Sequence, residues 1–521
     1  MKMNKLLCGA AVIAGVIATC VAVGPELWAQ QVSPANQVPP AYQSSGPTGC
    51  VGCAVDVSAS RAQALGAASQ PPPQGGNLSL PGAPPSTYSQ QRVGTPTDLP
   101  NPLPYDLLLR GGHVIDAKNN IDRVSDVAIK DGKIAAVGDH LNARDAAKTI
   151  DAKGLLVTPG LIDIHTHVYA STGEKLSLAG DESVWPDGFT FRTGVTTVVD
   201  AGSSGWRNFE DFKEHIIDRS ETRVLVSLNI VGAGMRGVRF EDNIADMDGE
   251  ATGAMAKRYP GIVVGIKSAH FVGPEWEPYI QAVKAGTIAN IPVMIDYGSN
   301  RIERPLAELL STYLRPGDIY THTFSGYRGE QDTRTLKASQ ALRVGRSRGI
   351  WFDAGTGSGS LRFAVAIPLI RDGFKPDSIS TDLHTGSMNG GTKDMLNVMG
   401  AFMASGLTLQ EAVADSTWHP AREIKQEQLG NLSVGAPADV AVINVQHGSF
   451  GFMDADNRRV PGDTRLTCEL TVRAGKVVYD LNGMATDDWN KPLSSDPKVA
   501  AHWTARPPRV LLPAQITPTE K

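Results

Sequence analysis

Residues 161–169 read LIDIHTHVY, an apolar run that ends in two histidines separated by one threonine. Side chains alternate between the faces of a strand, so residues two apart share a face, and His165 and His167 are expected to point the same way. Neutral imidazole binds zinc and similar cations, with a zinc–nitrogen distance of about 2.0–2.1 Å. Two histidines at this spacing supply half of a metal site, and the alternative is an ordinary strand end. The rest of the chain decides between these interpretations.

A series of strand-like runs follows this stretch, between residues 159 and 424. Eight apolar runs alternate with helix-compatible stretches such as NFEDFKEHIIDR (208–219), and this alternation predicts parallel strands joined by crossover helices. The section is about 260 residues long, close to the roughly 250 typical of a (β/α)8 barrel. We therefore predict an α/β fold built on a (β/α)8 TIM-like barrel. The eight runs span residues 161–165, 195–200, 223–231, 261–267, 291–296, 318–322, 349–353 and 378–382.

At the ends of these runs we single out five residues that can bind a metal or act as a base. In a barrel the carboxyl ends of the strands meet at one face, where the loops build the active site. A charged group after an apolar strand is costly to bury unless it is paired or bound to a metal. Each residue alone has a plainer explanation, but their order along the chain favours a shared site. The five are His165, Lys267, Asp296, His322 and Asp382.

Short apolar runs with turn signals flank the middle section. Upstream, YDLLLRGGHVID (105–116) and DVAIKDGKIAAVG (126–138) predict strands, with hairpin turns at 110–112 and 130–133. Residues 429–481 have the same texture. We expect the two flanking segments to pair into one small β-sandwich domain.

The N-terminus has the order of basic, apolar and small residues that is typical of a secretory signal. Lys2 and Lys5 precede an apolar run of about 18 residues, and cleavage is expected near Ala29. The run is at the lower limit for a membrane span, so an uncleaved anchor is the alternative. Cys20 loosely resembles a lipidation site, with a poor fit at the preceding threonine. We expect export to the periplasm or out of the cell.

Residues 30–100 are dominated by Pro, Gln, Ser, Gly and Ala, and such a segment buries too little apolar surface to offset its ordering entropy. Within it, Cys50 and Cys53 have no second CxxC to complete a four-sulfur site, so a local disulfide or pairing with another chain is favoured. The expected parts of the chain are a signal peptide (1–29), a disordered linker (30–100), the first part of the β-sandwich (101–158), the barrel (159–424), the second part of the β-sandwich (425–485) and a C-terminal tail (486–521).

The composition is that of a globular protein, with 41% hydrophobic and 20% charged residues. The formal net charge is −5, and no run of Lys and Arg would follow a phosphate backbone or an anionic membrane. Nucleic acid is not an expected partner, and a membrane is expected only through an uncleaved N-terminal anchor. A small-molecule amide is the expected partner, and a homo-oligomer is compatible with the sequence.

Five stretches, in this order, carry a resemblance: TGVTTVVDAGSSG (193–205), GIKSAH (265–270), GDIYTHTFSG (317–326), FDAGTGSGS (352–360) and PDSISTDLH (376–384). Together with LIDIHTHVY they resemble the amidohydrolase superfamily. More closely, they are similar to the deacetylase branch of dihydroorotase-like metallohydrolases, which includes bacterial N-acetyl-mandelate deacetylase-like proteins. The resemblance extends from about residue 106 to residue 481.

This resemblance implies one or two Zn²⁺ ions, or another divalent metal, at the barrel mouth. His165, His167 and Asp382 would hold the first metal, a carboxylated Lys267 would bridge, and His322 would hold the second. Zinc lowers the pKa of bound water from 15.7 to about 7, and Asp382 would act first as general base and then as general acid. The implied reaction is hydrolysis of the C–N bond of a small N-acyl substrate.

The chain departs from the family pattern at two strand ends. The fifth strand usually ends in His, and Asp296 stands there, which either keeps a second site with a harder metal preference or marks its loss. After the seventh strand, Gly355-Thr356-Gly357 stands where Gly-His-Gly is frequent. The alternatives are a cyclic-amide hydrolase of the dihydroorotase or hydantoinase kind, and a secreted binding protein with a lapsed metal site. Four further residues lie near strand ends without a pattern that favours substrate contact: Tyr169, Asn229, His270 and His384.

Overall fold

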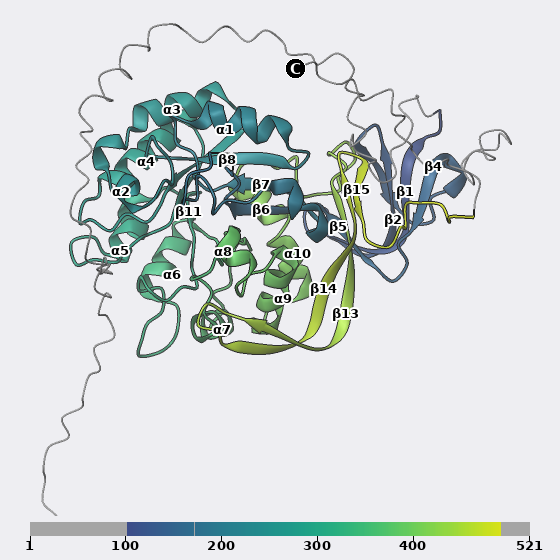
Figure 1. Cartoon of the computed structure of the whole chain (residues 1–521). Helices are drawn as coiled ribbons and strands as arrows, with labels where there is room; N and C mark the ends of the chain where they lie inside the picture. The colour runs from purple at the N-terminus through teal and green to yellow at the C-terminus, as the bar shows by residue number, and fades with distance from the viewer. Residues whose placement is uncertain (1–101, 171, 491–521) are drawn as a thin grey trace, which may run out of the picture. The chain divides into compact units, whose positions relative to one another are not determined.

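The structure is a computed structural model and describes residues 102–170 and 172–490. That part of the chain contains two β-sheets and a set of α-helices (Figure 1). The expected signal peptide with Cys20 and Ala29, the linker with Cys50 and Cys53, and most of the expected tail lie outside the described residues. Among the described helices, none has the length and apolar character needed to cross a membrane.

The first sheet joins strands from both ends of the described chain. Its strands are β1 (Tyr105–Asp116), β2 (Ile121–Lys130), β3 (Lys133–Gly138), β4 (Ala146–Asp151), β5 (Leu156–Pro159), β13 (Val440–Met453), β14 (Arg459–Arg473) and β15 (Lys476–Asp480). Their order is β15-β14-β13-β5-β1-β2-β3, and β4 pairs with β1. β5 runs antiparallel to β13, which confirms that the flanking segments share a sheet. The second layer of a sandwich stays a prediction.

One expected hairpin turn in this sheet is wrong. Residues 110–112 lie within β1, where the register to β2 shifts between Leu109 and Gly112, so this stretch is a bulge and not a turn. A Cβ at Gly112 would lie 2.4 Å from Val157 Cγ2, and the close packing of β5 therefore requires glycine there. The other expected turn, at 130–133, is confirmed by the pairing of β2 with β3 and by positive φ angles at its two central residues.

The second sheet is parallel and curled. Its strands are β6 (Leu161–Thr166), β7 (Val195–Asp200), β8 (Arg223–Asn229), β9 (Val263–Ser268), β10 (Val293–Ile295), β11 (Ile319–Tyr320) and β12 (Trp351–Phe352). Each strand pairs with the next in sequence order. The run expected as an eighth strand, together with the residue that follows it, reaches both edges of this sheet by single parallel bridges, from Ser378 to Asp353 and from Leu383 to Thr166.

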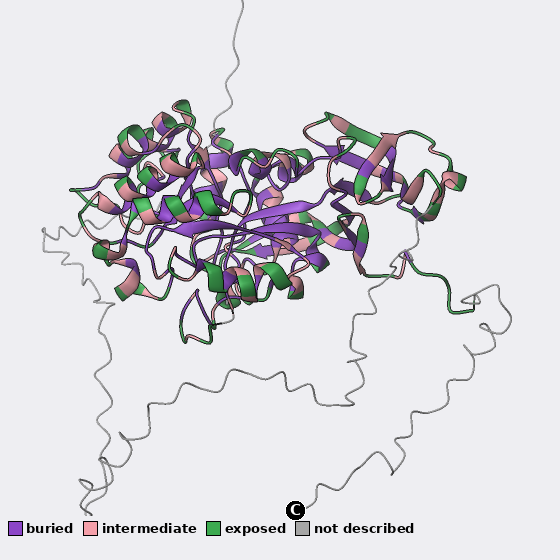
Figure 2. Cartoon of the chain, turned by 90° about the horizontal axis from the view of Figure 1, so that it is seen from above, coloured by how far each residue is buried: buried purple, intermediate pink, exposed green. Residues whose placement is uncertain are grey.

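Helices follow the strands of the curled sheet, as the alternation of runs predicts (Figure 1). Apolar residues of the strands are divided between two core clusters, one shared with helices such as α1 and α4 and the other with α11. Figure 2 shows the strands mostly buried and the outer faces of the helices exposed. The helices are α1 (Phe209–His215), α2 (Val238–Glu241), α3 (Gly249–Arg258), α4 (Glu277–Ala289), α5 (Leu306–Glu308), α6 (Gln340–Ser347), α7 (Phe363–Arg371), α8 (Thr385–Met388), α9 (Met395–Ser405), α10 (Leu409–Ala414) and α11 (Trp418–Glu423).

Candidate metal centre

Three of the residues singled out in the sequence converge at one end of the curled sheet. His165 is the last residue but one of β6, His167 follows the strand, and both side chains are 1% exposed. Asp382 reaches them from the bridging run 378–382, with its Oδ1 3.0 Å from His167 Nε2 and 3.5 Å from His165 Nε2. Ligand atoms of all three lie within 4.8 Å of one another. The two ends of the described barrel-like section therefore meet at this cluster.

A buried hydroxyl and carboxylate fix the tautomer of His165. Its Nδ1 lies 3.0 Å from Thr321 Oγ1, and the Thr321 hydroxyl donates to Asp353 Oδ2 at 2.6 Å. Because the hydroxyl has a single proton and gives it to the carboxylate, it must accept the proton of His165 Nδ1. The lone pair of neutral His165 is therefore on Nε2, which faces Asp382.

The other two histidines have their Nδ1 atoms held in the same way. His167 Nδ1 lies 3.0 Å from the Ser203 hydroxyl, which also hydrogen-bonds to Asp200. His322 Nδ1 donates to the carbonyl of Gly355 at 2.5 Å. Both rings therefore present an Nε2 lone pair to the cluster when they are neutral.

This arrangement of lone pairs fits a divalent metal. His322 Nε2 lies 3.2 Å from Asp296 Oδ2, a spacing similar to those between the first two histidines and Asp382. Two lone pairs at such distances repel each other unless a cation or a proton lies between them. Ligands of a tetrahedral zinc ion at about 2.0–2.1 Å lie roughly 3.3 Å apart. Nitrogen and carboxylate oxygen are also the ligand atoms of catalytic zinc sites.

Lys267 lies beside His165 in the site. It is fully buried in β9, and its Nζ is 2.8 Å from His165 Nε2. Burial lowers the pKa of Lys267, while the charges of Asp296 and Asp382 oppose that shift. A lowered pKa favours the neutral amine, which is the form that reacts with carbon dioxide to give a carbamate.

Asp296 has the cation partner that its burial requires. It follows β10, is 2% exposed, and accepts a hydrogen bond at Oδ1 from Arg328 Nη2 at 3.0 Å. Its Oδ2 lies close to His322 and also 3.0 Å from His270 Nε2. Burial alone raises the pKa of Asp296, but the two histidines outweigh burial and place this pKa well below its usual value. Asp296 is thus an ionised carboxylate with one oxygen paired and the other facing two imidazoles.

Known proteins resemble this chain over most of its described length. The model of the amidohydrolase family matches residues 367–479. A deacetylase of Brucella anthropi is 31% identical over 344 residues, which cover 64% of this chain and 81% of the relative. A deacetylase of Enterococcus faecalis is 30% identical over 389 residues, which cover 73% of this chain and 100% of the relative. This chain belongs to the amidohydrolase family.

Solved structures similar to this amidohydrolase agree with that assignment. The crystal structure of an adenine deaminase is 28% identical, with a TM-score of 0.66, and covers 72% of this chain and 100% of its own. The crystal structure of a dihydroorotase is also 28% identical, with a TM-score of 0.63, and covers 72% of this chain and 99% of its own.

Sequence reasoning missed several residues that shape the site of this amidohydrolase. Arg328 comes from the loop after β11 and Glu241 from α2 after β8, and each reaches the site through a contact about thirty positions away in the chain. Thr321 precedes His322, and Asp353 lies in the motif FDAGTGSGS (352–360). Only the fold shows that both residues lie close to His165. A search for polar residues adjoining the strand ends would have found these two and not the others.

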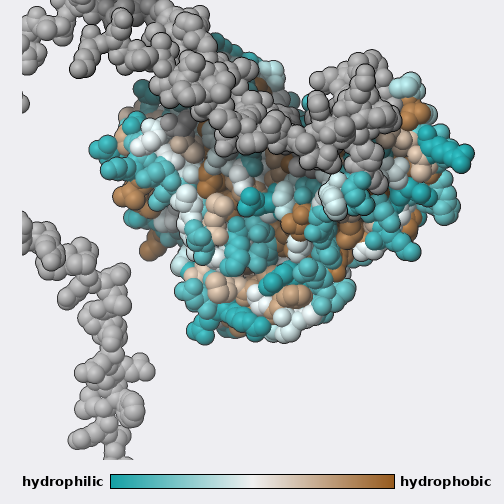
Figure 3. Space-filling model, turned by 45° about the vertical axis from the view of Figure 1, so that its right-hand side comes forward, coloured by the Kyte–Doolittle hydropathy of each residue, from teal (hydrophilic) through white to brown (hydrophobic). Residues whose placement is uncertain are grey.

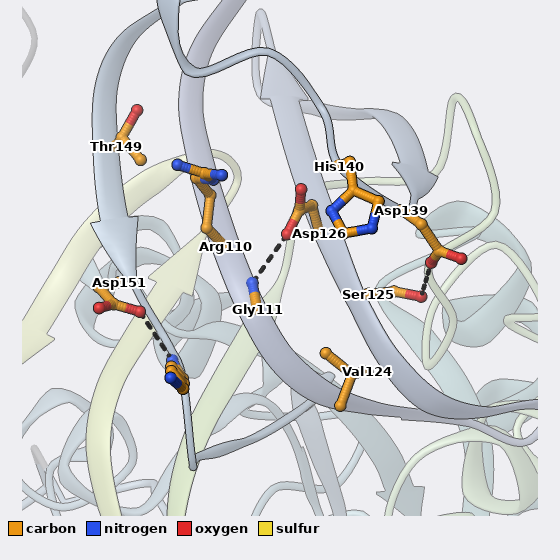
Figure 4. A pocket seen from close by; sticks show the side chains of 10 residues that line it. Arg110, Gly111, Val124, Ser125, Asp126, Asp139, His140, Thr149 and Asp151 are labelled. Carbon is orange, nitrogen blue, oxygen red and sulfur yellow. Dashed lines mark hydrogen bonds between the residues drawn. The ribbon is translucent and has the colours of Figure 1, made fainter.

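The remaining polar residues near strand ends have structural partners. Tyr169 donates to Asp211, Asn229 donates to the carbonyl of Gly202, and His384 caps α8. A cavity of about 580 Å³ lies elsewhere, on the first sheet (Figure 4). None of the singled-out site residues lines it, and its buried carboxylate, Asp126, already accepts two backbone N–H groups.

Proposed function

We propose that this chain is a metal-dependent amidohydrolase that removes an acyl group from the nitrogen of a small substrate. The observation that carries the proposal is the convergence of His165 Nε2 and His167 Nε2 on Asp382 Oδ1. The deacetylases of Brucella anthropi and Enterococcus faecalis support acyl removal as the reaction. The proposed scaffold is a (β/α)8 barrel over residues 159–424, closed through the run 378–383, with a β-sandwich from 101–158 and 425–485.

The proposed metal is zinc, held first by His165, His167 and Asp382. Lys267, as a carbamate, would link this position to a second one held by Asp296 and His322. When bound, zinc would lower the pKa of water from 15.7 to about 7. Its positive charge would polarise the acyl oxygen of the substrate. The fixed Nε2 lone pairs support this assignment.

Asp382 is the proposed general base and then general acid. Burial raises its pKa, but His165 and His167, whose Nε2 atoms face its Oδ1, outweigh burial and hold this pKa below its usual value. The ionised carboxylate therefore accepts a proton from the attacking water at neutral pH. Its Oδ2 faces Gly357, where no side chain blocks it, and can pass the proton to the leaving nitrogen.

A cyclic-amide hydrolase is the second candidate, because a dihydroorotase structure is similar over 72% of the chain. A panel of N-acetyl amino acids, dihydroorotate and hydantoins distinguishes the two candidate functions. Each substrate is assayed with the metal-free protein and again after zinc is added. Zinc-dependent acetate release from the linear substrates supports the proposed function. Ring opening alone supports the second candidate, and metal binding without any turnover supports a binding protein with a lapsed site.

We also propose that the protein is exported after cleavage near Ala29. The order of residues in the N-terminal segment supports this proposal. Mass spectrometry of protein from the native compartment tests it, and an intact Met1 in a membrane pellet would favour the anchor.

A further inference from the structure

A buried glutamate lies behind the first metal position and has no role in the proposed chemistry. Glu423 is the last residue of α11 and is 1% exposed. This helix packs against β6, since Ala421 shares an apolar cluster with Ile162 and Ile164. The partners of Glu423 within the described part of the chain include no cation: its Oε2 lies 3.0 Å from Ser378 Oγ, and its Oε1 is buried without a hydrogen bond. A carboxylate charge buried in this way is costly, which favours the neutral acid.

The single proton of the Ser378 hydroxyl decides which of two buried acids is neutral. Ser378 Oγ lies 3.0 Å from Glu423 Oε2 and 2.8 Å from Asp353 Oδ1. A hydroxyl can donate to only one of them and must accept from the other. Asp353 Oδ2 already accepts from Thr321 at 2.6 Å and from Ser380 at 2.8 Å, and such hydrogen bonds favour an ionised carboxylate. Glu423 therefore carries the proton and donates it to Ser378, which leaves the Ser378 proton for Asp353.

The charges around Glu423 agree with this assignment. Burial raises the pKa of Glu423 well above its usual value, and the negative charges of Asp353, Asp377 and Asp415 raise it further. The hydrogen bond with Ser378 opposes the shift without cancelling it. A neutral Glu423 avoids a second negative charge beside Asp353.

Hydrogen bonds then converge on Asp353 from two sides. On one side His165 Nδ1 donates to Thr321, which donates to Asp353 Oδ2. On the other side the acid of Glu423 donates to Ser378, which donates to Asp353 Oδ1. We propose that Glu423 is a neutral carboxylic acid and acts as a positioning residue for His165. It keeps the Ser378 proton on Asp353, and the Asp353 carboxylate holds the ring of His165 with its Nε2 lone pair toward the first metal position.

Infrared spectroscopy of the metal-free, full-length protein tests the protonation of Glu423. A neutral carboxylic acid has a carbonyl stretching band at a higher frequency than carboxylates and amides. The difference spectrum between wild type and Glu423→Gln near neutral pH should show the loss of one such band. Glu427→Gln is the matched control, because Glu427 is exposed and lies four residues further along the chain, and it should remove none. An unchanged acid region in Glu423→Gln would overturn the neutral acid.

Ser378→Ala reads the direction of the hydrogen bond and does not depend on Glu423→Gln folding. Without the Ser378 oxygen the acid of Glu423 loses its acceptor, and the carbonyl band of an acid without a hydrogen bond lies at a higher frequency. The difference spectrum should therefore show the band leaving its wild-type frequency and returning at a higher one. A band that keeps its wild-type frequency in Ser378→Ala would contradict donation to Ser378.

Titration with Zn²⁺ against a chromophoric chelator tests the positioning role, which rests on the proposed function because it takes His165 as a metal ligand. Glu423→Gln keeps a neutral N–H donor for Ser378 and should bind zinc like wild type. Glu423→Leu has a similar size without a donor and should bind zinc about three- to tenfold more weakly, less than the 10–100-fold effect of losing a direct partner of a ligand. Ser378→Ala should show a similar loss, and adding Glu423→Leu to it should change little, since both break the same chain.

Equal zinc affinity in Glu423→Leu and wild type would overturn the positioning role. Additive losses in the double variant would also overturn it, because Glu423 would then act by packing and not through Ser378. A wild type that binds no zinc would overturn the proposed function and the positioning role together, while the infrared spectra would still decide whether Glu423 is neutral. The failure of the proposed function is therefore distinguishable from the failure of this inference.

Discussion

Asp382 is the residue on which the proposed proton transfers depend. Asp382→Asn keeps the shape of the side chain but cannot accept a proton, so turnover should fall by about 10²–10⁴-fold with an unchanged circular dichroism spectrum. Asp131→Asn is the matched control, since Asp131 has a similar φ of 50° in the turn between β2 and β3, and it should keep wild-type activity. A loss of less than tenfold in Asp382→Asn would show that Asp382 is not the base.

Thr321 connects His165 to Asp353 and should set the affinity of the first metal. Thr321→Val keeps the shape but removes the hydroxyl that accepts from His165 Nδ1, so metal affinity should fall by about 10–100-fold. Chelator competition measures it. Thr321→Ser keeps the hydroxyl and should bind like wild type, and equal affinity in Thr321→Val would mean that the hydroxyl does not orient the ring.

Sequence patterns could identify residues at strand ends but not their partners. His165, His167 and Asp382 come together as expected, because parallel strands place their carboxyl ends at one edge. The sequence could not predict the pairing of Asp296 with Arg328, because the two residues are 32 positions apart and the path of a loop brings them together. The same holds for His270 and Glu241, which are 29 positions apart.

At the scale of elements, the loop after β12 must pass close to Asp382. Gly357 has a φ of 51°, and a Cβ there would lie 2.2 Å from Asp382 Oδ2. Gly357→Ala should therefore displace the carboxylate and reduce turnover by about 10²-fold, the cost of roughly 1 Å of misplacement. Gly359→Ala is the control, because nothing lies within 4 Å of its added Cβ. Equal activity of both variants would contradict this requirement for glycine.

The junction of α10 and α11 should make stability depend on pH through Asp415. Burial raises the pKa of Asp415 from 3.8 to about 6, although His419 opposes the shift. The folded state then binds more protons than the unfolded state between about pH 4 and 6, so the free energy of unfolding falls as the pH rises. From pH 5 to pH 7, wild type should lose about 1 kcal/mol more than Asp415→Asn. Urea unfolding of both metal-free proteins measures it, and equal losses would contradict the raised pKa.

The elements themselves were predictable, while their lengths were not. All of the first seven runs contain a strand where periodicity placed one, but β11 and β12 have only two residues each. The eighth run makes isolated bridges instead of a regular strand. Local sequence pattern does not show where strand pairing is interrupted, and for the same reason Gly111 and Gly112 predict a turn where the structure has a bulge.

For the whole molecule, the pairing of β5 with β13 brings together segments about 280 positions apart and confirms that the chain returns to its starting sheet. Similar turn and strand patterns on both sides of the middle section predicted this return. The sequence does not show how many layers that domain has, because an apolar strand face can be covered by either a second sheet or a helix. On the face that Figure 3 shows, hydrophobic residues lie in small groups among hydrophilic ones.

The zinc content of wild-type protein is the most direct test of a metal-dependent hydrolase. The protein should be expressed with added zinc and purified without chelators, and elemental analysis should give metal per chain. Two ions are expected if the position at Asp296 and His322 also binds metal, and one ion if only His165, His167 and Asp382 do. Replacing His165 and His167 by alanine should remove the ion held at the first position. A metal content near zero in the folded wild-type protein would contradict the metal-dependent mechanism.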